Sequence, residues 1–282
     1  MDTIMTMAAM TKDRIGALCT IGPAAAFMVG IVGIPLFYIL YVSFNGPHFS
    51  PSAYVMLLSS RLFFQSLWST FETSILATVL SVLLGYPVAV HLARQPARRR
   101  ALMMIMVLMP FWTSVLVKSY AFTIILGRRG IINTALSCVV GHKVALPLLF
   151  NKFSVVIGMA NYLVPFVVFP VLASLLAIDP ALGRAATLMG ARPMRVFRQI
   201  TLPLSLPGVI AGASSTFIIS LGFFVVPALL GGRHDVMLAN LVDFYTRETL
   251  DWPAAAAIGM CLLAVIGMCG FIATTLRKVR RV

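Results

Sequence analysis

Glu72 and Lys118 are the acidic and the basic side chain that we place in or beside the long apolar runs of this sequence. A charge within a membrane is costly, so such residues mark either a solute pathway or a structural ion pair. The structural alternatives for Glu72 are an ion pair with Lys118 and exposure at the membrane surface. Aromatic residues that could line a pathway through cation–π contacts, or simply pack between helices, are Trp112, Tyr162, Phe223 and Phe224.

The short motifs of common enzymatic chemistry are missing from this sequence. It has no G-x-x-x-x-G-K-[ST] phosphate loop, no H-E-x-x-H zinc pair and no G-x-S-x-G nucleophile elbow. Its four histidines are scattered, and its four cysteines show no metal-ligand spacing. We therefore expect no catalytic residues, no metal site and no cofactor bound by the chain itself.

Composition places the chain in a membrane. Its 282 residues are 60% hydrophobic and 11% charged, which leaves too little polar sequence to cover a soluble domain. The apolar runs are long enough to cross a bilayer and lack the alternation of barrel strands. We expect an all-α integral membrane protein, one domain over residues 1–282, whose first span is retained rather than cleaved. The six expected spans are 15–44, 66–92, 102–126, 155–177, 204–230 and 254–276.

The net charge of +14 is unevenly distributed. Most Lys and Arg residues lie near the two termini and in the loops 93–101 and 179–202. The excess of Lys and Arg in cytoplasmic loops predicts that these segments, and therefore both termini, are cytoplasmic. Orientation and contact with the lipid surface then account for most of the basicity, so we expect the bilayer and no nucleic acid as a partner.

The polar loop at 178–203 interrupts two apolar runs. Asp179, followed by proline, is a helix start, because a carboxylate caps free N–H groups and proline suits the first helical position. Gly190 can end that helix in the left-handed conformation. The small side chains of Ala185 and Ala186 let another surface approach closely. A second short helix, leading back to the membrane at its end, completes a compact knob suited to docking; an ordinary solvated connector is the plainer interpretation.

The order of residues in this loop resembles the EAA loop of permease subunits in type I ATP-binding-cassette (ABC) importers. The family pattern E-A-A, G and I-x-L-P corresponds here to Arg184-Ala185-Ala186, Gly190 and Ile200-Thr201-Leu202-Pro203. The resemblance extends over most of the chain and is closest to the spermidine/putrescine permease branch. Supporting segments, in order, are LGYP (84–87), PFWTS (110–114), GRRGIIN (127–133), PALLGG (227–232) and DWP (251–253).

This resemblance implies a bacterial inner-membrane permease subunit that moves a solute from periplasm to cytoplasm by alternating access. The solute would be polyamine-like, or a related amine or amino-acid derivative. The implied partners are a second homologous permease, two cytoplasmic ATPase subunits that bind ATP and Mg, and a periplasmic solute-binding protein. The chain itself would not be an enzyme. Residues implied to couple to the ATPase are Asp179, Arg184, Ala185, Ala186, Gly190, Arg192, Phe197, Leu202 and Pro203.

Two positions depart from the family pattern. Arg184 replaces the glutamate of E-A-A, so the acidic contact of that position is absent or inverted. Phe223 lies just before PALLGG, in a position that is often acidic in relatives. If that acid helps to hold a cationic polyamine, its absence makes an opine-like compound or a phosphonate as plausible a solute as a polyamine. Lys118 resembles a basic position that follows PFWTS, which suggests an architectural role.

The alternatives from other classes are an ATP-independent channel and an ion-coupled secondary carrier. A passive channel has no need of a knob that docks with a motor subunit. An ion-coupled carrier usually has more ionisable groups in its spans than this sequence provides.

Overall fold

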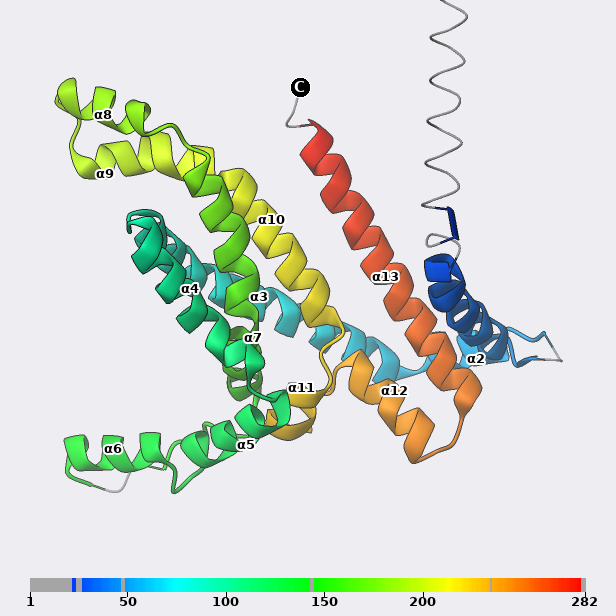
Figure 1. Ribbon diagram of the computed structural model, residues 1–282. Helices are drawn as coiled ribbons and strands as arrows, with labels where there is room; N and C mark the ends of the chain where they lie inside the picture. Colours follow the sequence, from blue (N-terminus) through cyan, green and yellow to red (C-terminus); the bar gives the residue numbers. More distant parts are fainter. Residues whose placement is uncertain (1–21, 24–26, 47–48, 143–144, 234, 280–282) are drawn as a thin grey trace, which may run out of the picture.

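The computed structural model describes residues 22–23, 27–46, 49–142, 145–233 and 235–279, and within these residues every regular element is a helix (Figure 1). The expected all-α fold is confirmed. The helices after Phe27–Ser43 are α2 (Ser52–Ser59), α3 (Arg61–Ala93), α4 (Ala97–Trp112), α5 (Val115–Leu126), α6 (Ile131–Val140), α7 (Lys152–Leu176), α8 (Pro180–Leu188), α9 (Pro193–Val196), the π-helix η2 (Phe197–Thr201), α10 (Leu202–Leu221), α11 (Val225–Leu230), α12 (Leu238–Arg247) and α13 (Trp252–Val279).

Five helical segments of the described residues are long and apolar enough to cross a membrane: Arg61–Ala93, Val115–Val140, Lys152–Leu176, Pro193–Leu221 and Trp252–Phe271. The predicted spans 66–92, 155–177 and 254–276 correspond to α3, α7 and α13. The predicted first span, 15–44, begins outside the described residues, and its described part contains the shorter apolar helix Phe27–Ser43. The count of six spans therefore stays a prediction.

The third predicted span, 102–126, is wrong as a single helix. The chain is extended at Thr113 and Ser114, where ψ is 135° and 133°, and this break separates α4 from α5. Pro110, in the last turn of α4, cannot donate a helical hydrogen bond and so weakens the helix just before the break. In Figure 1, α5 and α6 run across the end of the bundle instead of continuing the direction of α4.

The fifth predicted span, 204–230, is also interrupted. Helix α10 ends at Leu221 with Gly222 as its C-cap, and α11 begins at Val225. Pro227 has no N–H with which to continue a helix from α10, but it is tolerated in the first turn of α11, where N–H groups have no helical partner. The side-chain amide of Asn240 donates to the Phe224 carbonyl in the break, at 3.1 Å.

Helix α7 is the centre of the main bundle and packs against both α3 and α10. Gly208 and Gly212, on one face of α10, bring its backbone against α7: a Cβ built at Gly208 would lie 2.5 Å from the Ser174 Cβ and 2.6 Å from the Pro170 carbonyl oxygen. Such small residues permit close packing of membrane helices. The G-x-x-x-G motif therefore packs within the chain.

The buried side of α3 is a stripe of small hydroxyl residues. Thr70 accepts a 2.8 Å hydrogen bond from the backbone N–H of Leu238, which ties α3 to the start of α12. Small polar side chains allow close approach and hydrogen bonding between membrane helices. The buried hydroxyl residues of the stripe are Ser66, Ser69, Thr70, Thr73, Ser74, Thr78 and Ser81.

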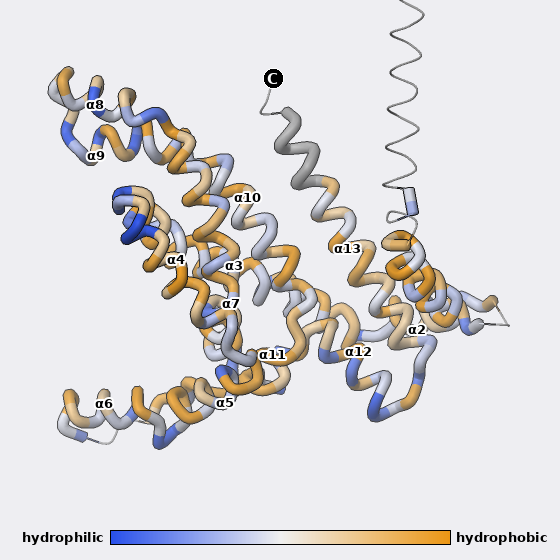
Figure 2. Tube along the Cα trace, viewed as in Figure 1, coloured by the Kyte–Doolittle hydropathy of each residue, from blue (hydrophilic) through white to orange (hydrophobic). Residues whose placement is uncertain are grey.

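The segments predicted to be cytoplasmic lie at one end of the molecule. Figure 1 shows the turn between α3 and α4, the α8–α9 segment and the last described turn of α13 at the same end, with α5, α6 and α12 at the other. The chain start predicted to share this side lies outside the described residues. Figure 2 shows hydrophilic residues at the start of α4 and along α9.

Candidate functional site

The predicted knob begins and ends as its sequence indicates. The Asp179 carboxylate accepts a hydrogen bond from the Ala181 backbone N–H at 2.8 Å, and Pro180 is the first helical residue of α8. At the other end Gly190 has φ +80°, in the left-handed region. The Gly190 N–H donates to the Thr187 carbonyl and the Ala191 N–H to the Ala186 carbonyl, both at 3.0 Å. This pair of bonds is a Schellman motif, which satisfies the last carbonyls of the helix.

Large apolar side chains lie exposed at the far end of this knob. Leu188 is 89% exposed, Met189 is 87% exposed, and Met194, across the turn, is 68% exposed. Ala185 is exposed and Ala186 is half-buried, so the small face predicted from the sequence is accessible. In Figure 1 the α8–α9 turn is the part of the knob farthest from the bundle. Apolar residues gathered at an exposed tip indicate a surface that another macromolecule covers.

The second half of the knob differs from the prediction, because no break separates it from the membrane span. Helices α9, η2 and α10 form one helical segment that bends but is not interrupted at Leu202-Pro203. The Leu202 N–H donates to the Phe197 carbonyl, five residues earlier. Pro203 removes a helical N–H, and a π turn just before it accommodates the proline without ending the helix.

Phe197 anchors this segment to α3. Its ring lies edge-on to that of Tyr86, with 6.2 Å between the centroids. The Tyr86 hydroxyl in turn lies 3.0 Å from the Ser205 Oγ of α10. The predicted coupling residue Phe197 therefore fixes the base of the knob instead of belonging to its exposed tip.

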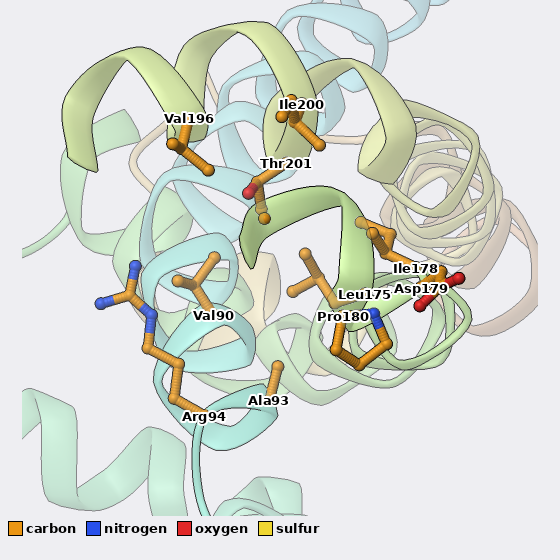
Figure 3. Close-up of a pocket in the computed structure, with 11 residues that line it drawn as sticks. Val90, Ala93, Arg94, Leu175, Ile178, Asp179, Pro180, Val196, Ile200 and Thr201 are labelled. Atoms are coloured by element: carbon orange, nitrogen blue, oxygen red, sulfur yellow. The ribbon is translucent and has the colours of Figure 1, made fainter. Parts of the chain in front are cut away.

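A cavity of about 210 Å³ lies at the base of the knob, between the ends of α3 and α7 and the α8–η2 segment. Figure 3 shows the lining side chains around it, with Arg94 on one side and Asp179 on the other. Most of the lining is aliphatic, including Val90, Leu175 and Ile200. The contact between the base of the knob and the bundle is therefore not fully packed beside the Phe197–Tyr86 anchor.

Among the predicted pathway residues, Glu72 has a partner that the sequence did not suggest. The Lys152 Nζ, at the start of α7, lies 2.6 Å from the Glu72 Oε2, and both side chains are about one-third exposed. Pairing of Glu72 with Lys118 is therefore wrong. An ion pair at this depth lowers the cost of an acidic group beside the membrane.

Lys118 caps the end of α4 at the break before α5. Its Nζ donates to the Pro110 carbonyl at 2.7 Å and lies 5.1 Å from the centre of the Tyr162 ring. The Pro110 carbonyl is one of the last four of α4, which have no partner within the helix. The architectural interpretation of Lys118 agrees with this contact.

Tyr162 and Phe223 belong to a continuous aromatic cluster. Their ring centroids are 5.3 Å apart, and Tyr162 also contacts Phe111 and Phe166 at 5.3 and 5.9 Å. Phe111 and Phe166 were not among the predicted pathway residues. Phe166 follows Tyr162 by four residues on one helix, a spacing that puts two side chains on the same face and could have revealed it.

The predicted pathway residues do not form one site. Trp112 is 73% exposed, and Phe224 lies at the break before α11, where its carbonyl accepts from Asn240. Lys152, the partner of Glu72, precedes Tyr162 by ten residues of α7, which is about 15 Å along the helix axis. Among the described residues, no three His, Cys, Asp or Glu side chains are grouped so that they could hold a metal ion.

Comparison with known proteins gives one consistent family. Residues 78–280 match the family described as "Binding-protein-dependent transport system inner membrane component". The spermidine/putrescine transport system permease protein PotB of Escherichia coli (strain K12) is 32% identical over 220 residues, which cover 78% of this chain and 80% of that protein. PotB of Haemophilus influenzae is 29% identical over 260 residues, covering 90% and 91%.

Solved structures show the same fold. A chain of the bacterial alginate ABC transporter, in complex with an alginate pentasaccharide-bound periplasmic protein, aligns with a TM-score of 0.72. The alignment covers 95% of this chain and 96% of that chain at 18% sequence identity. At this identity the likeness is evidence for the fold and not for the solute.

Proposed function

Because the chain belongs to the family of binding-protein-dependent transport system inner membrane components, and to the PotB-like branch of type I ABC permeases, we propose that it completes an ATP-driven importer. It pairs with a second, similar permease in the bacterial inner membrane, with both termini in the cytoplasm. Two cytoplasmic ATPase subunits bind ATP and Mg, and a periplasmic binding protein delivers the solute. The chain itself catalyses no reaction.

The observation that supports this proposal best is the exposed apolar tip of the knob. Leu188 and Met189 flank a turn that Gly190 holds in a left-handed conformation, so the tip has a defined shape as well as an apolar surface. Docking of this tip into the ATPase couples closure of the ATPase pair to movement of α10, which continues directly from the knob. Alternating access is the resulting mechanism.

For the solute we propose a polyamine or a related amine or amino-acid derivative. The names of the PotB relatives support this class. The aromatic cluster around Tyr162 provides ring faces that attract an amine cation. Lys118 lies over one of these rings, and the acid Glu72 is paired with Lys152, so the described residues of this subunit offer no free carboxylate at the cluster. Charge selection then depends on the binding protein and the sister permease.

The test is uptake of labelled putrescine, spermidine and amino acids into vesicles that contain the assembled transporter. We expect uptake only when ATP is present on the side of the membrane that carries the ATPase subunits and the solute-loaded binding protein is present on the other side. Gly190→Val puts a β-branched side chain at φ +80°, a strain of roughly 1–3 kcal/mol, and should lower coupled uptake at least tenfold while ATP hydrolysis persists.

The matched control is Gly183→Ala, in the same short helix, where an added Cβ has no atom within 4 Å. It should keep normal uptake. Passive uptake without ATP would favour a channel, and loss of uptake with an ionophore at constant ATP would favour an ion-coupled carrier.

A further inference from the structure

The knob carries an excess of unpaired positive charge. Arg184, Arg192, Arg195 and Arg198 are all exposed. In the part of the chain that the structure describes, the ion pairs are Lys152–Glu72 and Arg247–Asp243, so none of these four guanidinium groups has a carboxylate partner among those residues. Their charge is available to another molecule.

The carboxylate of the knob already forms a hydrogen bond within its own helix. Asp179 is the acidic residue of the 178–203 loop, and its Oδ1 accepts the Ala181 N–H at the start of α8. The exposed tip at Leu188 and Met189 lies at the other end of this helix, about 13 Å away. The docking tip therefore has no acidic residue of its own to offer to a basic partner.

Three of the arginines surround one hollow. The surface between α9 and the π turn is hollowed, and the residues that line it are Arg192, Met194, Arg195, Arg198 and Gln199. Guanidinium groups present paired N–H donors that match the two oxygens of a carboxylate. A hollow with three such groups and one amide suits an acidic side chain much better than a neutral or basic one.

We infer that the ATPase surface that receives this knob is acidic, with an apolar floor for Leu188, Met189 and Met194 and carboxylates facing Arg184 and the arginine-lined hollow. This inference rests on the proposed function, and it goes beyond it by stating the charge of the partner.

An anionic membrane is the competing partner for a cationic and apolar surface. Insertion into lipid requires apolar side chains directed to the bilayer and arginines behind them. Here Figure 1 places the apolar tip away from the bundle of membrane helices, so the tip is not directed toward the bilayer that surrounds that bundle. This placement favours a protein partner.

The experiment uses the assembled transporter, purified through a tag on this chain from its own host, with the copurifying ATPase identified, removed and then rebound. Rebinding to the permease in nanodiscs is measured from about 50 mM to about 500 mM NaCl, where the Debye length falls to roughly 4 Å. Arg184→Gln and Arg195→Gln should each raise Kd about tenfold at low salt, and Arg195→Glu by about 100-fold or more. Wild type and the Gln variants should converge at high salt.

Two controls separate the possible failures. Arg99→Gln removes an exposed arginine at the same end but on α4, and should leave Kd unchanged. Met189→Ser removes the apolar tip without changing charge: if it does not weaken rebinding, the docking proposal itself fails. If Met189→Ser weakens rebinding but the arginine variants do not, or if Arg195→Glu strengthens it, the acidic surface is refuted and docking stands.

A third measurement tests the membrane alternative. The purified transporter is mixed with phosphatidylcholine vesicles, with and without phosphatidylglycerol. Loss of vesicle binding in Arg195→Gln, with an unchanged Kd for the ATPase, would overturn the inference in favour of anionic lipid.

Discussion

Replacing Gly208 with alanine should separate α10 from α7. The new Cβ would lie 2.5 Å from the Ser174 Cβ, 2.6 Å from the Pro170 carbonyl oxygen and 3.0 Å from the Val171 Cα. Two of these three atoms belong to the backbone, so no side-chain rotation can relieve the overlap. Overpacking of this kind costs about 1–3 kcal/mol, and we take the upper half of that range because the backbone of α7 must move.

Alanine also has a higher helix propensity than glycine, which offsets roughly 1 kcal/mol of this cost. The expected net loss for Gly208→Ala is therefore about 1–2 kcal/mol in the free energy of unfolding. It is measured by reversible unfolding in mixed micelles followed by tryptophan fluorescence. The matched control is Gly259→Ala in α13, where an added Cβ meets no atom within 4 Å and stability should be equal or higher. If both variants are equally stable, α10 and α7 do not pack as closely as described.

Three further predictions test the roles of Lys118 and Phe223 and the topology. Lys118→Met should destabilise the α4–α5 break by about 1–3 kcal/mol because the Pro110 carbonyl loses its donor, and Lys118→Arg should restore most of this; equal unfolding of the Met variant and wild type would contradict the capping role. Phe223→Glu should shift competitive vesicle uptake toward more cationic solutes with the binding protein held constant, whereas an unchanged solute ranking would make Phe223 a packing residue. Cysteines placed at positions 97 and 129 should differ in labelling from outside intact spheroplasts, with only position 129 reached; the reverse pattern would invert the topology.

The long helices and the knob could be predicted because each depends on local physical rules. An apolar run of sufficient length must be helical in lipid, which located α3, α7 and α13. The start and end of α8 follow from capping chemistry at Asp179 and Gly190, which is encoded in a few adjacent residues.

The breaks at 113–114 and 222–224 could not be placed because proline alone does not show where a helix ends. Prolines at 110 and 227 weakened both predicted spans, but proline is also tolerated inside α3, α7 and α10 of the same chain. At each break a side chain donates to a backbone carbonyl, Lys118 to that of Pro110 and Asn240 to that of Phe224. The Glu72–Lys152 pair was missed because its members are 80 residues apart.

The uninterrupted segment from Pro193 to Leu221 makes the knob one end of a lever. Its 29 residues follow a continuous helical path of about 43 Å, which bends between α9 and α10. One end carries the arginines beside the exposed tip, and the other ends at Gly222, next to Phe223 of the aromatic cluster. Tilting α10 itself, 20 residues and about 30 Å long, by about 10° around its middle displaces each of its ends by roughly 3 Å in opposite directions. The segment bends where α9 and the π turn at 197–201 meet α10, as Figure 1 shows, so the knob stands at an angle to α10.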